Sequence, residues 1–446
     1  MAKNILTGKF FSILILSLLL CIPLAMIGMT VGEREQSRNA VRADIAASSA
    51  GSQTLAGPVL VLPYRELVTS TSQNEHGKRE TTTAWVSRVK YWLPENLDIR
   101  GDMDTERRHR GIYEVEIFRT PFVMQGHFDI KPGEVMSSDM VRYEQPYLAL
   151  GISDVRGIMS MPILKLNDQV VTLESGSNIA AFPGGLHATM DSVAVGRLNF
   201  NLQLDIKGME SLEFLPLGRD TTISLASTWP HPSFFGRYLP DAPDISSKGF
   251  QARWRSNFLS NNMETLFANC MNGNCEPFNN NVLGVKLIDA VDVYLQAERA
   301  HKYGILFVAL TFAAFLLFEV LKDLRIHPVQ YSLVGVSLVL FFLLLLSLSE
   351  HVAFLHAYVT ASAACIGLIT FYVSYVLHSI WRALGFAALL AALFGALYGL
   401  LQSEDFALLL GSLLLFVIVA GIMVITRKLD WYKVGGQVLG KSASAP

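Results

Sequence analysis

The sequence has 446 residues, of which 51% are hydrophobic and 17% are charged, and its mean hydropathy is positive. Soluble proteins contain about 25% charged residues, so this composition indicates a protein with a large membrane part. The net charge of −2 provides no basic excess, and we therefore expect no nucleic-acid partner. Four cysteines are too few for a disulfide scaffold of the kind that stabilises small secreted proteins.

The charged residues are distributed unevenly along the chain. Residues 304–426 contain eight charges in 123 positions, whereas residues 33–303 contain 59 charges in 271 positions, which is close to the soluble norm. The sequence therefore predicts one part that is solvated by water and another that is solvated by lipid.

Residues 10–31 form an uncharged run of 22 residues. As a helix this run is about 33 Å long, enough to cross a hydrocarbon core of about 30 Å. Lys3 and Lys9 precede it, as they would in a cleaved signal peptide. However, the run exceeds a typical signal-peptide core, and no A-x-A-like site precedes Gly32-Glu33. We predict a cytoplasmic N-terminus (residues 1–9) and an uncleaved transmembrane helix (residues 10–31).

The second apolar block, residues 304–426, is divided by short polar interruptions. It predicts five more transmembrane helices, six in all, at residues 304–321, 328–348, 352–376, 383–401 and 406–426. A Gly395-x-x-x-Gly399 pattern in the fourth helix of this block predicts close helix packing.

The orientation is predicted from the short segments between the helices. With the N-terminus inside, nine Lys and Arg residues lie on the cytoplasmic side and none in the two outer short loops. We expect a multi-pass membrane protein with both termini cytoplasmic. Residues 32–303 are then a domain outside the cytoplasm, which is periplasmic if the cell has an outer membrane, and residues 427–446 are a cytoplasmic tail.

The large aqueous domain has the pattern of a β structure with helical stems at both ends. Residues 33–49 and 294–303 are expected to be the stems. Residues 198–206 alternate Leu, Phe, Leu, Leu and Ile with Asn199, Asn201, Gln203 and Asp205, which is typical of a strand with one apolar and one wet face. Further strands are expected at residues 59–64, 83–93, 111–118, 122–130, 147–152, 169–173, 221–227 and 250–258. These short strands predict a mostly antiparallel, sandwich-like domain.

The segment of residues 229–235 contains two prolines that hold the residues between them in an extended form. Its aromatic residues favour a structural loop that is anchored in the hydrophobic core. The alternative is a contact with a partner through Trp229, His231, Ser233 and Phe234. His231 has no acidic residue or second histidine beside it in the sequence, which disfavours catalysis.

Cys270 and Cys275 are separated by four residues. No second cysteine pair or histidine cluster is near them, so a local disulfide in an oxidising compartment is favoured over a metal site. We expect no metal and no cofactor.

Two ionisable residues of the apolar block are candidates for an intramembrane function. A carboxylate in the middle of a bilayer costs about 2.5–3.5 kcal/mol, so Glu319 requires an explanation. Pairing with Lys322 near the cytoplasmic interface is the favoured interpretation. His356 is a possible proton-sensitive group, although a position at the outer interface is favoured.

The tail pattern Gly435-x4-Gly440-Lys441-Ser442 matches a phosphate-binding loop only formally. That chemistry needs a helix after the loop, and only four residues follow, so we expect no nucleotide. The sequence contains no G-x-S-x-G or H-E-x-x-H motif, and no paired-carboxylate arrangement, so an enzyme is not expected.

Several multi-residue segments occur in an order that resembles the CreD family of inner-membrane proteins. They are Leu55-Ala56-Gly57-Pro58-Val59-Leu60, Trp92-Leu93-Pro94-Glu95, Gly151-Ile152-Ser153-Asp154-Val155-Arg156-Gly157, Trp229-Pro230-His231-Pro232-Ser233-Phe234, Gly249-Phe250-Gln251-Ala252, His327-Pro328-x-Gln330-Tyr331 and Leu348-Ser349-Glu350-His351. The likeness covers nearly the whole chain. It implies a role in Gram-negative cell envelope integrity and in a stress response, with expression under a carbon-source-responsive two-component system and altered tolerance to a colicin and to β-lactams. It implies no catalytic residues.

The expected function is therefore the support of envelope integrity without catalysis, with the periplasmic domain binding an envelope protein or glycan and the helices contacting membrane lipid. The alternative is a transporter or lipid-handling protein that uses the C-terminal helix block and its polar residues.

Overall fold

The computed structural model describes residues 3–73, 79–135, 138–288, 293–321, 326–403 and 406–427. It divides into two compact units, one of residues 1–39 and 291–446 and the other of residues 40–290. The second unit lies within the range of residues 32–303 that was expected to form the aqueous domain. Helix α1 begins in the first unit and ends in the second.

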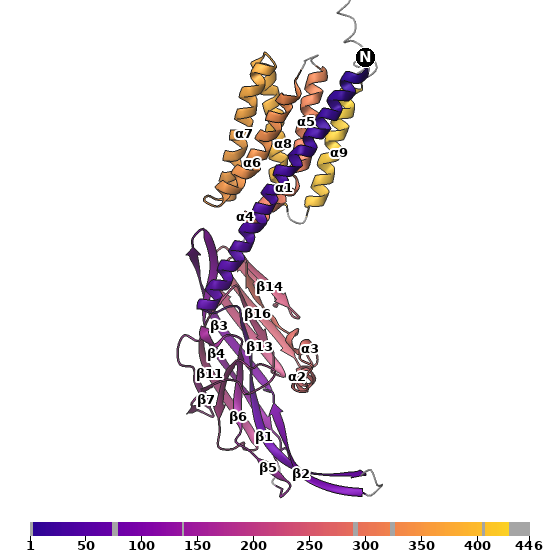
Figure 1. Cartoon of the computed structure of the whole chain (residues 1–446). Coiled ribbons are helices and arrows are strands. Elements are labelled where there is room, and N and C mark those ends of the chain that lie inside the picture. The colour runs from indigo at the N-terminus through magenta and orange to yellow at the C-terminus, as the bar shows by residue number, and fades with distance from the viewer. Residues whose placement is uncertain are drawn as a thin grey trace, which may run out of the picture. The chain divides into compact units, whose positions relative to one another are not determined.

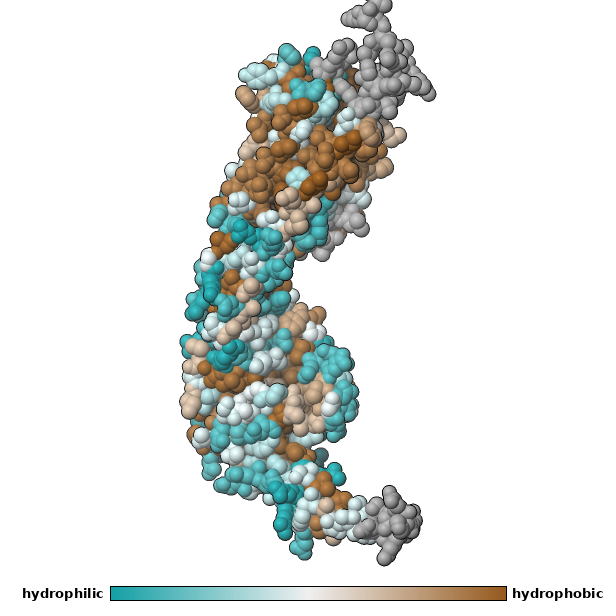
Figure 2. Space-filling view, viewed as in Figure 1, coloured by the Kyte–Doolittle hydropathy of each residue, from teal (hydrophilic) through white to brown (hydrophobic). Residues whose placement is uncertain are grey.

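The first unit is helical (Figure 1). Its described helices are α1 (Lys3–Ser48, continuing into the second unit), α4 (Val293–Lys302), α5 (Gly304–Leu321), α6 (Pro328–Ser349), α7 (Phe354–Val376), α8 (Ile380–Gln402) and α9 (Ala407–Thr426). Five of them are long and apolar enough to cross a membrane, or six if α4 and α5, which meet at 45°, are counted as one broken span. Exposed hydrophobic side chains lie on the first half of α1 and on α6, α7, α8 and α9, and form a brown band on the helical unit (Figure 2). The prediction of one apolar helix at the N-terminus followed by a block of about five is confirmed.

Phenylalanine side chains fill the interior of this unit. The ring centroid of Phe394 lies 4.6 Å from that of Phe307 and 4.7 Å from that of Phe341. These contacts join α8 to α5 and α6. Close approach between helices occurs at Gly335, whose Cα faces Leu20 and Phe312. The prediction for Gly395 and Gly399 is wrong, because no described atom lies within 4 Å of where a Cβ on either residue would stand.

The second unit contains two β-sheets. The nine-stranded sheet has the order β14-β17-β12-β1-β6-β10-β9, with β2 and β5 also paired to β1. The eight-stranded sheet has the order β15-β16-β13-β3-β4-β11-β7-β8. Their strands are β1 (Gln53–Gln73), β2 (Arg79–Trp92), β3 (Asn96–Arg110), β4 (Tyr113–Ile130), β5 (Val141–Tyr143), β6 (Tyr147–Ile152), β7 (Ile163–Leu166), β8 (Gln169–Val171), β9 (Glu174–Ser175), β10 (Gly185–Thr189), β11 (Gly196–Met209), β12 (Ser211–Leu215), β13 (Asp220–Ser227), β14 (Pro232–Gly236), β15 (Asp244–Ser246), β16 (Gly249–Asn257) and β17 (Leu283–Leu287).

The two sheets share one hydrophobic core. Phe122 of β4 in the eight-stranded sheet meets Phe214 of β12 in the nine-stranded sheet edge to face, with ring centroids 5.8 Å apart. The predicted alternation in β11 is confirmed, since Phe200 is buried and its neighbour Asn199 is exposed. Most strand pairs are antiparallel, while β1 with β12 and β3 with β13 run parallel.

Some strand boundaries differ from the prediction. The strands expected at residues 111–118 and 122–130 are one strand, β4, because its pairing with β11 continues without a break from Ile117 to Ile130. The ladder with β3 is interrupted around Pro121, where no amide N–H is available. The strand expected to reach residue 258 ends at Asn257, and the Phe258 side chain is largely exposed. The charged strand β3 was not predicted.

Two short helices, α2 (Met263–Met271) and α3 (Glu276–Asn279), pack with residues of β1 in a second hydrophobic cluster. Phe267 of α2 and Phe278 of α3 are buried there beside Val59 and Val61. Because Val59 and Val61 alternate with core-facing Leu60 and Leu62, this cluster lies on the other face of β1.

Candidate functional site

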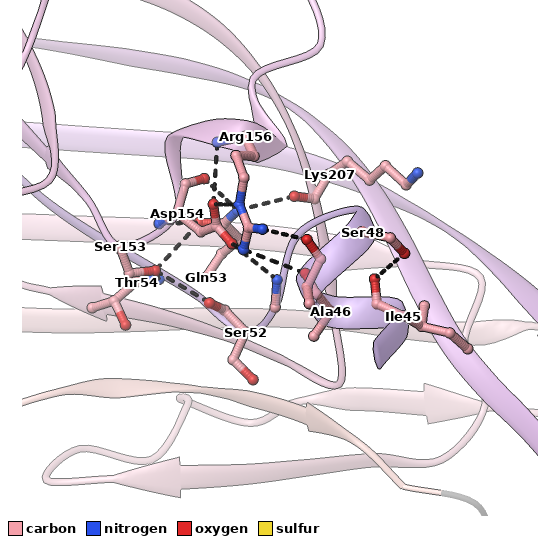
Figure 3. A network of polar contacts seen from close by, with 12 residues as sticks. Ile45, Ala46, Ser48, Ser52, Gln53, Thr54, Ser153, Asp154, Arg156 and Lys207 are labelled. Carbon is pink, nitrogen blue, oxygen red and sulfur yellow. Dashed lines mark hydrogen bonds and ion pairs between the residues drawn. The ribbon is translucent and has the colours of Figure 1, made fainter. Parts of the chain in front are cut away.

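The end of helix α1 is attached to the β domain by a network that we call the α1 cap, formed by Gln53, Asp154 and Arg156 (Figure 3). The Arg156 guanidinium donates hydrogen bonds to the carbonyl oxygens of Ala46 and Ala47 in the last turn of α1. Carbonyls at the end of a helix lack partners within the helix, and a cation there also complements the helix dipole.

Asp154 orients the arginine of the cap. Its carboxylate accepts hydrogen bonds from Arg156 Nε at 2.9 Å and Nη2 at 2.6 Å, and from the Gly51 amide at 3.3 Å. The hydrogen bond from the Arg156 side chain is the main cause that lowers the pKa of Asp154, with further contributions from the amides of Gly51 and Arg156, against an opposing effect of burial. The carboxylate is therefore held in its charged form.

Gln53 is fully buried and completes the cap. Its side-chain amide donates to the carbonyl oxygens of Asp154 at 2.9 Å and Lys207 at 3.0 Å. A Cβ on Gly157 would collide with this amide and with the Lys207 carbonyl, so a side chain at position 157 is not tolerated without rearrangement. The segment Ser153–Gly157 thus has a structural explanation that the sequence alone did not provide.

Two ion pairs add to this attachment. Arg42 of α1 forms an ion pair with Glu210, with 3.5 Å between Arg42 Nε and Glu210 Oε1. Asp44 of α1 forms an ion pair with Arg110 of β3. The last residues of α1 are therefore attached to the β domain at the cap and at two further points.

The segment of residues 229–235 is partly a strand. Trp229 is buried, and its indole N–H donates to the carbonyl oxygens of His231 at 3.0 Å and Ile288 at 3.2 Å. Residues 232–236 form β14, which pairs with β17 at the end of the nine-stranded sheet, where the prediction had a loop. Proline is accepted in an edge strand, which explains the difference.

The four predicted contact residues of this segment are therefore placed differently. Trp229 points into the core, whereas His231 is exposed. Ser233 is half-buried in β14. Phe234 is also half-buried, with its ring 5.4 Å from that of Phe250 and 5.6 Å from that of Trp254. A partner contact through this segment remains a prediction, and His231 is its most accessible side chain.

Cys270 and Cys275 are joined as a disulfide in the structure. The bond links the end of α2 to the residue before α3, beside the second hydrophobic cluster. Its formation in the cell stays a prediction.

Glu319 is buried in the helical unit, with 5% of its surface exposed. Its carboxylate accepts hydrogen bonds from the Tyr331 hydroxyl at 2.9 Å and from the Ile326 amide at 3.2 Å. Tyr331 belongs to α6, twelve residues along the chain. Lys322 lies outside the described residues, so the expected pairing of Glu319 with Lys322 near the cytoplasmic interface stays a prediction.

His356 is exposed near the start of α7. The structure records no contact between His356 and Glu319 among the described residues, so the two candidates do not form one site. Residues 435–442 of the tail lie outside the described part of the chain. Within that described part, no group of three or more His, Cys, Asp or Glu side chains is arranged to hold a metal.

Sequence reasoning missed a polar hollow on the outward face of the eight-stranded sheet. It has a volume of about 380 Å³ and lies over β3, β4, β7 and β11. Side-chain amides, among them Asn96, Gln125, Asn199 and Asn201, provide much of its lining. The signal was present in the sequence as the wet face of residues 199–205, but the neighbouring strands could not be assigned.

The chain is similar in sequence to known proteins. A family model described as "Inner membrane protein CreD" matches residues 5–432. The inner membrane protein CreD of Escherichia coli (strain K12) is 35% identical over 434 residues, which cover 97% of this chain and 95% of that protein. The chain therefore belongs to the CreD family of inner membrane proteins.

Proposed function

We propose that this protein supports the integrity of the cell envelope without catalysis, as a six-span inner-membrane protein whose β domain lies in the periplasm and binds an envelope component. The observation that carries the proposal is the α1 cap, which joins a domain with two broad sheets to the end of a membrane-capable helix. Such an attachment suits a domain that binds a partner close to the membrane.

The orientation is part of this proposal and rests on the distribution of Lys and Arg. It is tested by single cysteines introduced for labelling with a membrane-impermeant maleimide in cells whose outer membrane is permeabilised. We expect Asp168→Cys, in an exposed turn of the β domain, to be labelled while the inner membrane is still intact. Ser442→Cys should be labelled only after the inner membrane is broken. The reverse pattern would overturn the orientation.

The envelope role is tested by deleting the gene and measuring detergent sensitivity and envelope stress under conditions where the gene is expressed. We expect increased sensitivity, restored by the wild-type chain expressed at its native level. Unchanged sensitivity and stress in the deletion strain would refute the role. If the deletion strain is sensitive, photo-crosslinking from His231 in intact cells shows whether the partner contacts the segment of residues 229–235 or another surface.

The second candidate is a transporter or lipid-handling protein, and the burial of Glu319 favours it because buried carboxylates in helical membrane units are costly. Its test is the pair Glu319→Gln and His356→Ala, expressed in the deletion strain. This candidate predicts that at least one of the two variants fails to restore the wild-type phenotype, although the protein is present at its normal level in the membrane. Full restoration by both variants would exclude it.

A further inference from the structure

The outward face of the eight-stranded sheet carries a regular array of polar side chains. Asn96 of β3 is paired with His127 of β4, which is paired with Asn199 of β11. Gln125 of β4 is likewise paired with Asn201 of β11. Paired residues of neighbouring strands point to the same face, so these five side chains lie side by side on the face opposite the core.

Spacing within this array follows from sheet geometry. Neighbouring strands are about 4.8 Å apart, and residues two positions apart on one strand are about 6.8 Å apart. Asn199 and Asn201 are two positions apart, as are Gln125 and His127, so the array presents hydrogen-bonding groups at regular intervals in two directions. The hollow of about 380 Å³ lies over it, within the size range of about 300–1,000 Å³ of small-ligand sites.

The amide groups of this array are available to a ligand. Within the described residues, the side chains of Asn96, Gln125 and Asn201 make no hydrogen bond with the protein, whereas Asn199 donates to Asn167 at 3.4 Å. Each side-chain amide offers two donor hydrogens and one acceptor oxygen. A ligand with hydroxyl groups, which both donate and accept, matches this set.

The charges around the hollow decide against an ionic partner. Lys165 and Asp168 both line it and carry opposite charges. An acidic polymer would meet Asp168 as well as Lys165, with no cluster of cations to hold it. A protein partner that buries aromatic or aliphatic anchors would meet mainly polar groups here, since the aromatic ring of the lining, Phe200, is buried.

We propose that this amide array binds a neutral glycan strand of the cell envelope. The proposal deepens the envelope function proposed above and depends on it for the periplasmic position of the β domain. The hydroxyl groups of the sugar rings donate to and accept from the amides of Gln125, Asn199 and Asn201, while Asn96 and His127 contact the same strand from β3 and β4.

The experiment measures binding of the neutral tetrasaccharide tetra-N-acetylchitotetraose to the purified full chain in detergent by isothermal titration calorimetry. We expect saturable binding by the wild type. The double variant Gln125→Ala with Asn201→Ala should bind at least ten-fold more weakly, because each lost hydrogen bond weakens binding by several-fold to ten-fold. Circular dichroism and thermal melting confirm that the variant is folded.

The matched control is Gln251→Ala, which removes a side-chain amide from β16 on the outward face of the same sheet but outside this hollow. It should bind the tetrasaccharide as the wild type does. Tetragalacturonate, an acidic tetrasaccharide, should not bind saturably. No saturable binding of the neutral sugar, preference for the acidic one, or equal weakening by Gln251→Ala would each overturn the proposal.

The envelope function is tested separately by the deletion strain. If the deletion strain is sensitive but the purified chain does not bind the neutral sugar, only the assignment of the amide array fails. If the deletion strain shows no phenotype while the sugar binds, the envelope role fails and the binding site stands.

Discussion

The Tyr331 hydroxyl donates a hydrogen bond of 2.9 Å to the Glu319 carboxylate, and both side chains are buried in the helical unit. The same carboxylate accepts the Ile326 amide, which lies between α5 and α6. The next residue, His327, is the N-cap of α6, and its amide donates a hydrogen bond to the Gln330 side chain as part of a capping box. The family segment His327-Pro328-x-Gln330-Tyr331 therefore fixes the start of α6 and its contact with α5.

Replacing Tyr331 with Phe should destabilise this contact. The change leaves a buried carboxylate without one of its donors, at a cost of about 1–3 kcal/mol. We expect a lower Tm of the detergent-solubilised chain in a thermal unfolding assay. Tyr375→Phe is the control, because the Tyr375 side chain is 71% exposed. Equal Tm values for Tyr331→Phe and wild type would show that the hydrogen bond contributes little.

The α1 cap predicts a local effect of Arg156→Ala. Without the guanidinium, the carbonyls of Ala46 and Ala47 lose their side-chain donor, and the last turn of α1 should open more often. Hydrogen exchange followed by mass spectrometry should then show several-fold faster exchange in residues 40–50. Arg65→Ala is the control, because it removes an exposed ion pair with Glu144 that is not part of the cap. Unchanged exchange in Arg156→Ala would contradict the attachment.

The cap also predicts a dependence of stability on pH. The pKa of Asp154 is lowered in the folded protein, mainly by the hydrogen bond from Arg156. Its stabilising effect is therefore fully present above the unfolded pKa of about 3.9 and is lost as the pH falls through the lower folded value. The stability difference between wild type and Asp154→Asn should be largest at neutral pH and shrink in acid.

This difference can be measured as the change in Tm of the sheet signal in circular dichroism between pH 7 and pH 3. Asp168→Asn is the control, because Asp168 lies in an exposed turn at a positive φ of 68° that Asn also accepts. Its effect on Tm should not follow the same pH trend. A constant difference for Asp154→Asn across this range would refute the prediction.

Local patterns predicted the parts of the fold that depend on neighbouring residues. The alternation of β11 and the extension of the first helix beyond the apolar run were both predicted, because residues a few positions apart determine each of them. The strand β3 was missed because charged residues occupy its outward positions and most of its second half, where exposure replaces the usual alternation. A strand is recognised in a sequence by apolar residues at every second position, and in β3 such buried apolar residues occur only in the first half.

Contacts between distant residues were not predictable in this way. Arg156 reaches Ala47 across 109 positions, and no pattern in either segment specifies the other. The hydrogen bond from Tyr331 to Glu319 joins two helices, and no spacing within either helix predicts it. The amide array likewise requires the order of β3, β4 and β11 in the sheet, which the sequence left open.

The cysteines provide a direct chemical prediction. In denaturant without a reductant, alkylation should modify only Cys21 and Cys365, and prior reduction should add Cys270 and Cys275. Mass spectrometry of chain isolated from the native compartment counts the modified thiols. In the loop-entropy description, closing so short a loop raises the free energy of the unfolded chain by about 2 kcal/mol. The double variant Cys270→Ser with Cys275→Ser should therefore have a lower Tm. Modification of four thiols before reduction would show that the disulfide does not form.

Gly28 provides a test of helix packing in the first unit. A Cβ at this position would collide with the imidazole of His301, so α1 and α4 approach each other closely there. Gly28→Ala should force the ring to move and lower the stability of the detergent-solubilised chain by about 1–3 kcal/mol, as overpacking does in other interiors. Gly32→Ala is a matched control one turn further along the same helix, since no atom lies within 4 Å of its added methyl group.

A second substitution separates packing from helix propensity. His301→Ala removes the colliding ring, so Gly28→Ala should cost less stability in that background than in the wild type. The thermal unfolding of the four proteins in this cycle, measured with Gly32→Ala beside them, gives the coupling between positions 28 and 301. If Gly28→Ala and Gly32→Ala have the same effect, or if the two positions do not couple, then the close contact between α1 and α4 does not contribute to the stability of the helical unit.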